Sequence, residues 1–181
     1  FDGLYSGAFV WVNGKEVGYT QGGNNDAEFD ITPYVRTGSN NISVQVIRWT
    51  DGSYLEGQDM WHMSGLHRDV YLYATPRTFL RDHYVSTALT AQAGYKRGTM
   101  TFEMELDNRD GKAATKQIDI TLLSPAGEEL NSWSKTFSLA EGETSKTMKF
   151  TTPTLTNLQT WSAEHPTLYT LLFSQKSEEG K

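Results

Sequence analysis

The sequence predicts an all-β protein made of two consecutive β-sandwich regions. Short runs alternate apolar and polar residues, as Ile42, Val44 and Val46 do with Ser43 and Gln45, and this two-residue period is typical of a half-buried strand. Turn-forming residues interrupt the second half roughly every ten residues. The sequence has no helical run of ordinary length and no internal repeat. Together these features favour strands throughout.

The first region opens with a predicted β-hairpin. Residues 9–12 and 15–19 flank Asn13-Gly14, a pair that accepts the positive φ angles of a two-residue hairpin turn. A further strand is expected over residues 41–48, after the turn Gly38-Ser39-Asn40, and another over residues 69–74. Thr75-Pro76 marks the expected boundary, because proline cannot donate to a sheet ladder. We therefore predict domains at 1–76 and 77–181.

The second region reads as a series of strands separated by turns. The turns lie at residues 108–111, 124–127 and 141–143. This pattern predicts an immunoglobulin-like or fibronectin-like sandwich. Trp161 and, in the first region, Trp11 are expected to lie in the cores. The candidate strands are residues 79–89, 99–107, 117–123, 129–139, 144–151 and 168–174.

Composition excludes several classes of function. The 181 residues carry a net charge of −6, and residues 1–76 hold nine acidic and four basic side chains. This balance argues against a nucleic-acid or anionic-membrane partner. No apolar run approaches the roughly 20 residues of a membrane span, so we expect a soluble protein. With no cysteine, disulfides and thiolate chemistry are excluded, and the compartment, cytoplasmic or periplasmic and secreted, stays open.

The most informative segment is residues 48–61, which we call the motif loop. Aromatic faces can stack on the C–H face of a sugar, while carboxylates accept bonds from its hydroxyls. Two of the carboxylates could instead act as general acid and base, could bind a hard cation, or could simply form a solvated acidic loop. The carboxylates are Asp51, Glu56 and Asp59, and the aromatics are Trp49, Tyr54 and Trp61.

Other catalytic chemistry finds little support in the sequence. His62 and His67 lie five residues apart and could contribute to a zinc site, but no third ligand is in view, so hydrogen-bonded or solvent-facing histidines are the favoured interpretation. No phosphate loop or serine-hydrolase motif occurs. Arg68 is expected to pair with a carboxylate of the motif loop.

Four blocks in order resemble the N-terminal region of glycoside hydrolase family 2 β-galactosidases. The hairpin block resembles that of the family's jelly-roll domain, and the motif loop with its continuation through Arg68-Asp69-Val70 is the most specific of the four. The last block resembles the close of the first immunoglobulin-like domain. The blocks are residues 9–19, 27–34, 48–70 and 161–169.

This resemblance implies a fold and a role. The fold would be a partial jelly-roll followed by an immunoglobulin-like sandwich, and the parent enzyme a retaining β-galactosidase whose TIM barrel carries both catalytic glutamates. This chain would then hold no catalytic residue. Asp59 matches the aspartate that contacts a galactosyl hydroxyl and ligates sodium, and magnesium is a further candidate cofactor of the parent. Asp59 and Trp61 are the predicted substrate-binding residues, whereas Gly57 and His62 depart from the family's usual Asp and Arg.

We interpret the chain as a fragment of a longer protein, because it lacks an initiator Met and starts close to a strand. Its expected partners are a galactoside and the barrel of its own chain, in a parent that is often a homo-oligomer in this family. The fragment alone is expected to be inactive. Two alternatives stay open: a stand-alone carbohydrate-binding module using Trp49, Tyr54 and Trp61, and a structural or adhesive surface protein.

Overall fold

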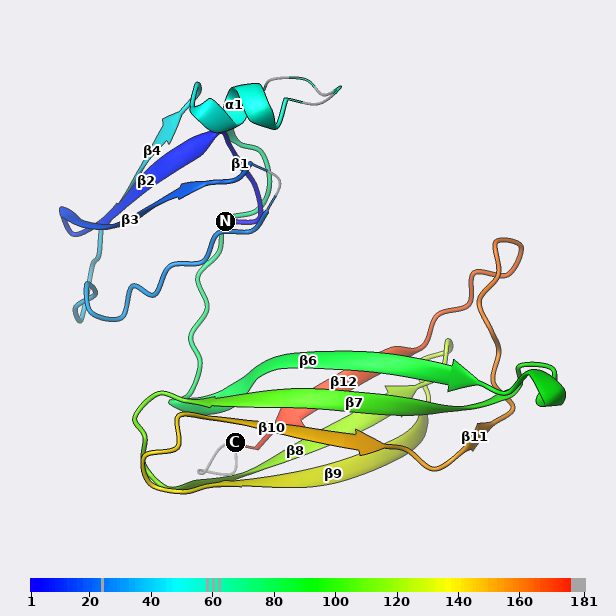
Figure 1. Ribbon diagram of the computed structural model, residues 1–181. Coiled ribbons are helices and arrows are strands. Elements are labelled where there is room, and N and C mark those ends of the chain that lie inside the picture. The colour runs from blue at the N-terminus through cyan, green and yellow to red at the C-terminus, as the bar shows by residue number, and fades with distance from the viewer. Residues whose placement is uncertain (24, 58, 60, 62, 177–181) are drawn as a thin grey trace. The chain divides into compact units, whose positions relative to one another are not determined.

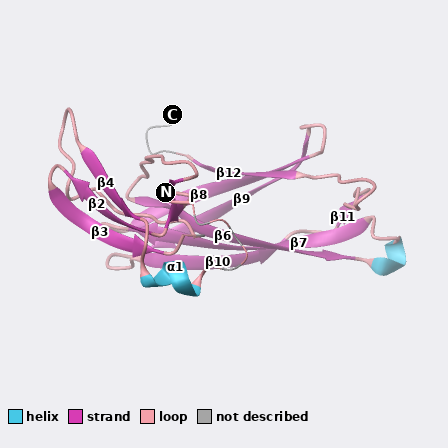
Figure 2. Ribbon diagram, turned by 90° about the horizontal axis from the view of Figure 1, so that it is seen from above, coloured by secondary structure: helices cyan, strands magenta, loops and turns pink. Residues whose placement is uncertain are grey.

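The computed structural model describes residues 1–23, 25–57, 59, 61 and 63–176. The chain forms two compact units, Phe1–Tyr73 and Ala74–Lys181, each with its own strands (Figure 1). Figure 2 shows that strands and loops make up almost all of both units, as the alternating sequence pattern predicts. The all-β fold class is therefore confirmed.

The first unit is built on a three-stranded antiparallel sheet in the order β3-β2-β4. The strands are β2 (Gly7–Val12), β3 (Lys15–Gln21) and β4 (Ile42–Ile47). Asn13 and Gly14 join β2 to β3 with φ angles of 52° and 79°, so the predicted hairpin is confirmed. Asn13 also fastens the turn, because its Nδ2 donates to the Tyr34 carbonyl at 2.9 Å and to Asn40 Oδ1 at 2.8 Å.

One face of this sheet forms the small core of the first unit. Ala8, Val10 and Val12 alternate along β2 and are at most 2% exposed. Leu4, from the two-residue strand β1 (Leu4–Tyr5), is buried as well, and β1 pairs with β5 (Gly65–Leu66). Burying each of the larger side chains, those of Leu4, Val10 and Val12, contributes about 1.5–3 kcal/mol.

The prediction of a strand over residues 69–74 is wrong. In the described residues this segment has no strand partner, and its backbone is tied at Asp69, whose carbonyl accepts from the Asp2 amide at 3.0 Å. Apolar alternation alone cannot make a strand, since a strand needs a neighbouring backbone to hydrogen-bond. Arg68, expected to pair with a loop carboxylate, instead donates to the Asp2 carbonyl at 3.4 Å.

The second unit is a sandwich of two antiparallel sheets (Figures 1 and 2). In one sheet, β7 (Arg97–Asn108) pairs with β6 (Thr78–Leu89), β10 (Ser145–Thr151) and β11 (Leu155–Thr156). In the other, β8 (Ala114–Leu123) pairs with β9 (Glu129–Leu139) and β12 (Thr170–Gln175). All six predicted strands are confirmed to within three residues at each end. A 3₁₀ turn, η1 (Ala91–Ala93), separates β6 from β7.

The sandwich core comes from every second residue of its inner strands. Phe102, Met104 and Leu106 of β7 face Ile118 and Ile120 of β8, and all five are 0% exposed. Phe102 also stacks on Phe150 with ring centroids 5.0 Å apart, which adds about 0.5–1.5 kcal/mol beyond area burial. The apolar residues of the two-residue period predicted from the sequence are thus the ones that fill the core between the two sheets.

The prediction that Trp11 and Trp161 lie in the cores is wrong for both. Trp11 is half-buried on the sheet face opposite the core, and Trp161 is 61% exposed. Trp161 lies in a loop before β12, where Ser162 and His165 exchange backbone hydrogen bonds. Within the residues described, no helix has both the length and the apolar character needed to cross a membrane.

Candidate functional site

The motif loop begins with a short capped helix. Helix α1 (Asp51–Leu55) follows β4 after residues 48–50. The Thr50 amide donates to Ser53 Oγ at 3.1 Å, and the Ser53 amide donates to the Thr50 carbonyl at 3.1 Å. Ser53 is 3% exposed, so this reciprocal bonding lies inside the unit. Capping satisfies amides that a helix terminus leaves unpaired, which explains a helix that propensity alone does not predict.

A buried serine fastens the base of the loop to the sheet. Ser6 Oγ lies 3.2 Å from the Arg48 carbonyl, 3.3 Å from the Ile47 carbonyl and 2.9 Å from Thr50 Oγ1. Ser6 is 2% exposed, so its hydroxyl has no water to replace these partners. The position at which the chain leaves β4 is therefore fixed by hydrogen bonds.

The carboxylate of Asp51 is already bound by its own chain. Gln21 Nε2 and the Gly52 amide both donate to Asp51 Oδ1, the second at 3.1 Å. Gln21 is held in turn, because its Oε1 accepts from the Tyr19 hydroxyl at 2.6 Å. Asp51 therefore orients α1 against β3 and is a poor candidate for a free general acid or base.

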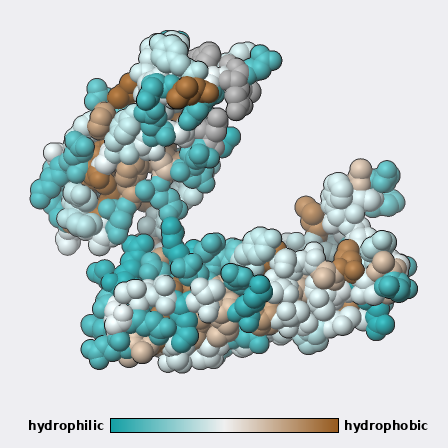
Figure 3. Space-filling model, viewed as in Figure 1, coloured by the Kyte–Doolittle hydropathy of each residue, from teal (hydrophilic) through white to brown (hydrophobic). Residues whose placement is uncertain are grey.

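The aromatic side chains of the loop project into solvent. Trp49 is 53% exposed and Tyr54 is 80% exposed, and their rings lie 6.3 Å apart at an angle of 30°. The Arg48 guanidinium lies 5.4 Å from the centre of the Trp49 ring. Leu55 is 84% exposed as well, and Figure 3 shows apolar surface beside α1. These exposed apolar side chains make the motif loop a candidate interaction surface.

The predicted site residues lie farther along the loop. Asp59 is an exposed turn residue, and Trp61 is 89% exposed. Glu56 is exposed too, whereas His62, proposed above as half of a zinc pair, lies outside the described residues. The side chains of Asp59 and Trp61 are thus available to a ligand, and their roles stay predictions.

A complete metal site is not formed by the residues described. Among them, no three His, Cys, Asp or Glu side chains gather closely enough to hold an ion. Sodium needs several oxygen ligands, so the Asp59 carboxylate fits one position of such a site and no more. The backbone amide of His67 donates to the Gly3 carbonyl at 3.2 Å, and the His67 ring lies against Gly3.

Sequence reasoning missed a tyrosine–carboxylate group beside the segment that follows β5. The negative charge of Asp2, together with a hydrogen bond to it, raises the pKa of Tyr71 above its usual value. Tyr73 donates its hydroxyl to Glu28 Oε1 at 3.0 Å. These contacts hold residues 69–73 in place without a strand, and no local sequence signal could have paired residues so far apart.

Family models match almost the whole chain. The model described as "Glycosyl hydrolases family 2, sugar binding domain" matches residues 1–76, and the one described as "Glycosyl hydrolases family 2" matches residues 78–181. The two matches fall on the two parts into which the sequence was divided above.

Curated relatives and solved structures agree with these models. A β-galactosidase of Priestia megaterium is 37% identical over 183 residues, covering 99% of this chain and 17% of the relative. One of Yersinia enterocolitica is 53% identical over 92 residues, covering 51% of this chain and 9% of the relative. A β-glucuronidase structure of Bacteroides uniformis covers 98% of this chain and 22% of its own, with a TM-score of 0.84 and 24% identity, which shows a shared fold. The chain thus spans about a sixth of the length of the full-coverage relative.

Proposed function

This chain belongs to glycoside hydrolase family 2, and we propose that it is the non-catalytic N-terminal part of a retaining β-galactosidase. The observation that carries this proposal is the 37% identity to a β-galactosidase along 99% of the chain. Retaining hydrolysis requires two carboxyl groups about 5–5.5 Å apart across the scissile bond. By the resemblance described above, both belong to the barrel of the parent enzyme, and this chain supplies binding groups.

Asp59 is the group proposed to bind the galactosyl unit. Its carboxylate is exposed and ready to accept hydrogen bonds from sugar hydroxyls. Bonds to a charged acceptor contribute about 1.5–3 kcal/mol, more than bonds between neutral groups. Because Ser6 and the α1 cap fix the start of the motif loop, this binding energy can position the glycosidic bond.

Trp61 is proposed to supply an apolar wall next to Asp59. Its ring is 89% exposed, so most of its surface is available for stacking on the C–H face of the sugar. A carboxylate and an indole two residues apart offer both halves of sugar recognition. The indole orients the ring, and the carboxylate distinguishes one hydroxyl configuration from another.

Asp59 is also proposed as one ligand of a sodium ion completed by the rest of the parent. The bound cation would hold the Asp59 carboxylate and a sugar hydroxyl in one fixed arrangement. In the residues described, Asp59 is not part of a cluster of three or more ligating side chains, so further oxygens would have to come from the rest of the parent. Magnesium stays a further candidate cofactor of the parent.

The test is a pair of loop variants in the full-length parent. Asp59→Asn should lower kcat/KM for a chromogenic β-galactoside about 10- to 100-fold, the equivalent of a lost charge-assisted hydrogen bond. Glu56→Gln, an exposed carboxylate of the same loop, serves as the matched control and should have little effect. If both variants match the wild type at unchanged melting temperature, Asp59 has no part in substrate binding.

A second candidate function is a carbohydrate-binding module that works without a barrel. The exposed, neighbouring rings of Trp49 and Tyr54, 6.3 Å apart between centroids, favour it. Calorimetric binding of galactose or lactose to the 181-residue chain, abolished by Tyr54→Ala, would support this candidate. If no such binding is measured, the carbohydrate-binding module is excluded and the galactosidase proposal is the remaining candidate.

A further inference from the structure

The sheet of the first unit carries an aromatic strip on the face opposite its core. Along β2, Ala8, Val10 and Val12 point into the core, so Phe9 and Trp11 point the other way and are half-buried. Tyr19 of β3 pairs with Phe9 across the sheet and is 42% exposed. Polar residues usually cover the solvent side of an antiparallel sheet, so three aromatic rings there need an explanation.

The three rings form a continuous surface. The Phe9 ring lies 4.6 Å from that of Tyr19 and 5.8 Å from that of Trp11, measured between centroids, with angles of 43° and 33° between their planes. None of the rings stands edge-on to its neighbour. A row of tilted rings presents π-faces along the sheet. Such a surface suits a ligand made of several linked rings better than one side chain that inserts into a pocket.

The position of Tyr19 is fixed by a glycine and a hydrogen bond. A Cβ atom on Gly7 would lie 2.8 Å from the Tyr19 hydroxyl, so the absence of a side chain lets the tyrosine lie along the sheet. The hydroxyl donates to Gln21 Oε1 at 2.6 Å, and Gln21 donates onward to Asp51. The strip is thus held in its exposed arrangement before any ligand arrives.

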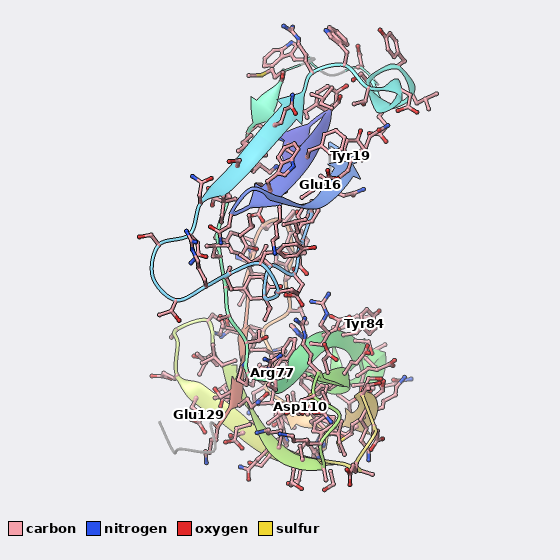
Figure 4. The ribbon with its side chains drawn as sticks, turned by 90° about the vertical axis from the view of Figure 1, so that its left-hand side faces the viewer. Glu16, Tyr19, Arg77, Tyr84, Asp110 and Glu129 are labelled. Atoms are coloured by element: carbon pink, nitrogen blue, oxygen red, sulfur yellow. The ribbon has the colours of Figure 1, made fainter. Side chains whose placement is uncertain are left out.

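Hydrogen-bonding side chains border the strip. Glu16 and Ser43 pair with Trp11, and Gln45 pairs with Phe9, so all three lie on the same face as the rings. All three are exposed, and Figure 4 shows Glu16 and Tyr19 on β3. Within the described part of the chain, the Glu16 and Gln45 side chains make no hydrogen bond or ion pair, so their polar atoms are free for a ligand.

The side chains on this face limit the classes of ligand that it can bind. The residues in register with the rings include a carboxylate and no Lys or Arg, which disfavours anionic ligands such as nucleic acids or uronic acids. Three partly buried rings offer far less area than the roughly 800 Å² per partner of a stable protein interface. Aromatic faces bordered by free hydrogen-bonding groups match a neutral sugar chain.

We propose that the aromatic strip of Phe9, Trp11 and Tyr19 is a binding surface for a neutral oligosaccharide. Sugar rings stack on Trp11 and Tyr19, and their hydroxyls bond to Glu16 and Gln45. The surface shares no residue with the Asp59–Trp61 site. It therefore stands whether or not the galactosidase function proposed above holds.

The test is isothermal titration calorimetry on the 181-residue chain with cellotetraose, a linear β-linked galactotetraose and an oligogalacturonide. The neutral tetraoses should bind and the acidic one should not. Tyr19→Ala should weaken binding about tenfold, the equivalent of one lost stacking contact. Gln45→Ala, at an exposed position without internal bonds, should keep the fold and weaken binding about threefold.

Two control variants decide where binding takes place. Tyr84→Ala removes an isolated tyrosine of β6 that is 69% exposed, and Tyr54→Ala removes the loop tyrosine, so neither should change the affinity. Failure of both tetraoses to bind would overturn the proposal. So would binding that is lost with Tyr54→Ala but kept with Gln45→Ala, because the ligand would then lie on the motif loop.

Discussion

Replacing Ser6 with alanine removes the hydroxyl that fastens the motif loop to the sheet. The Ser6 side chain lies within 3.3 Å of three oxygens, the carbonyls of Ile47 and Arg48 and the hydroxyl of Thr50, and is 2% exposed. A hydroxyl has one proton to donate, so Ser6→Ala loses about one donated and one accepted hydrogen bond. The methyl group that remains cannot replace them, and water cannot enter so small a space.

The expected cost follows from these contacts. Each buried hydrogen bond contributes about 0.5–1.5 kcal/mol, and partners left unpaired add to the loss, so the free energy of unfolding should fall by about 2 kcal/mol. A loss of this size changes the ratio of folded to unfolded molecules about 30-fold. The loop should also loosen, since Thr50 and Ser53 form the cap just beyond this anchor.

The assay is urea unfolding of the 181-residue chain, followed by tryptophan fluorescence. Trp11, Trp49 and Trp61 report on the first unit. Ser39→Ala is the matched control, because Ser39 is exposed in a loop, and it should change stability by less than about 0.5 kcal/mol. A Ser6→Ala chain as stable as the Ser39→Ala chain would refute the view that Ser6 anchors the loop.

Three further outcomes are expected from other buried or charged groups. Asn108→Ala should destabilise the second unit by about 3 kcal/mol in urea unfolding, since the 0% exposed amide bonds two carbonyls and a hydroxyl. The Ser134 hydroxyl, with other donors, lowers the pKa of Asp119 below 3.8. The ionised carboxylate therefore stabilises the fold above that pH, and this contribution is lost as pH falls through the lowered pKa. In the Asp119→Asn variant the melting temperature should fall less steeply with decreasing pH than in the wild type. The charge of Asp2 raises the pKa of Tyr71 above 10.0. The protonated Tyr71 hydroxyl therefore contributes to stability below that pH, and this contribution is lost as pH rises through the higher pKa. Asp2→Asn should shift the absorbance titration of the tyrosinate to lower pH.

Most of the second unit could be predicted because apolar and polar residues alternate within its strands. Strand β9 has the predicted bounds, Glu129–Leu139, and β7 extends the predicted strand by two residues at its start and one at its end. In both strands the buried residues follow a two-residue period, so the pattern and the packing agree. Among the strands of this unit that the structure describes, β11 alone was not predicted, because two residues are too few to show a period.

The first unit was harder to predict because its contacts join distant residues. The apolar run at residues 69–74 looks like a strand, yet its observed contacts are hydrogen bonds from Asp2 and to Glu28. Helix α1 contains Gly52 and Ser53, which have weak helix propensity, and it forms through capping and burial. Likewise, Trp11 was predicted to lie in the core, and only the burial along β2 and its register with β3 and β4 showed that Trp11 shares the open face with Phe9.

The central claim is that this chain is a non-catalytic part of a β-galactosidase. The most direct measurement compares hydrolysis of a chromogenic β-galactoside by the 181-residue chain, by the longest parent chain and by the parent lacking these residues, alone and mixed with the fragment. We expect activity in the parent, none in the fragment, and recovery when the two parts are mixed. Hydrolysis by the 181-residue chain alone, abolished by Asp59→Asn or Glu56→Gln, would contradict the central claim.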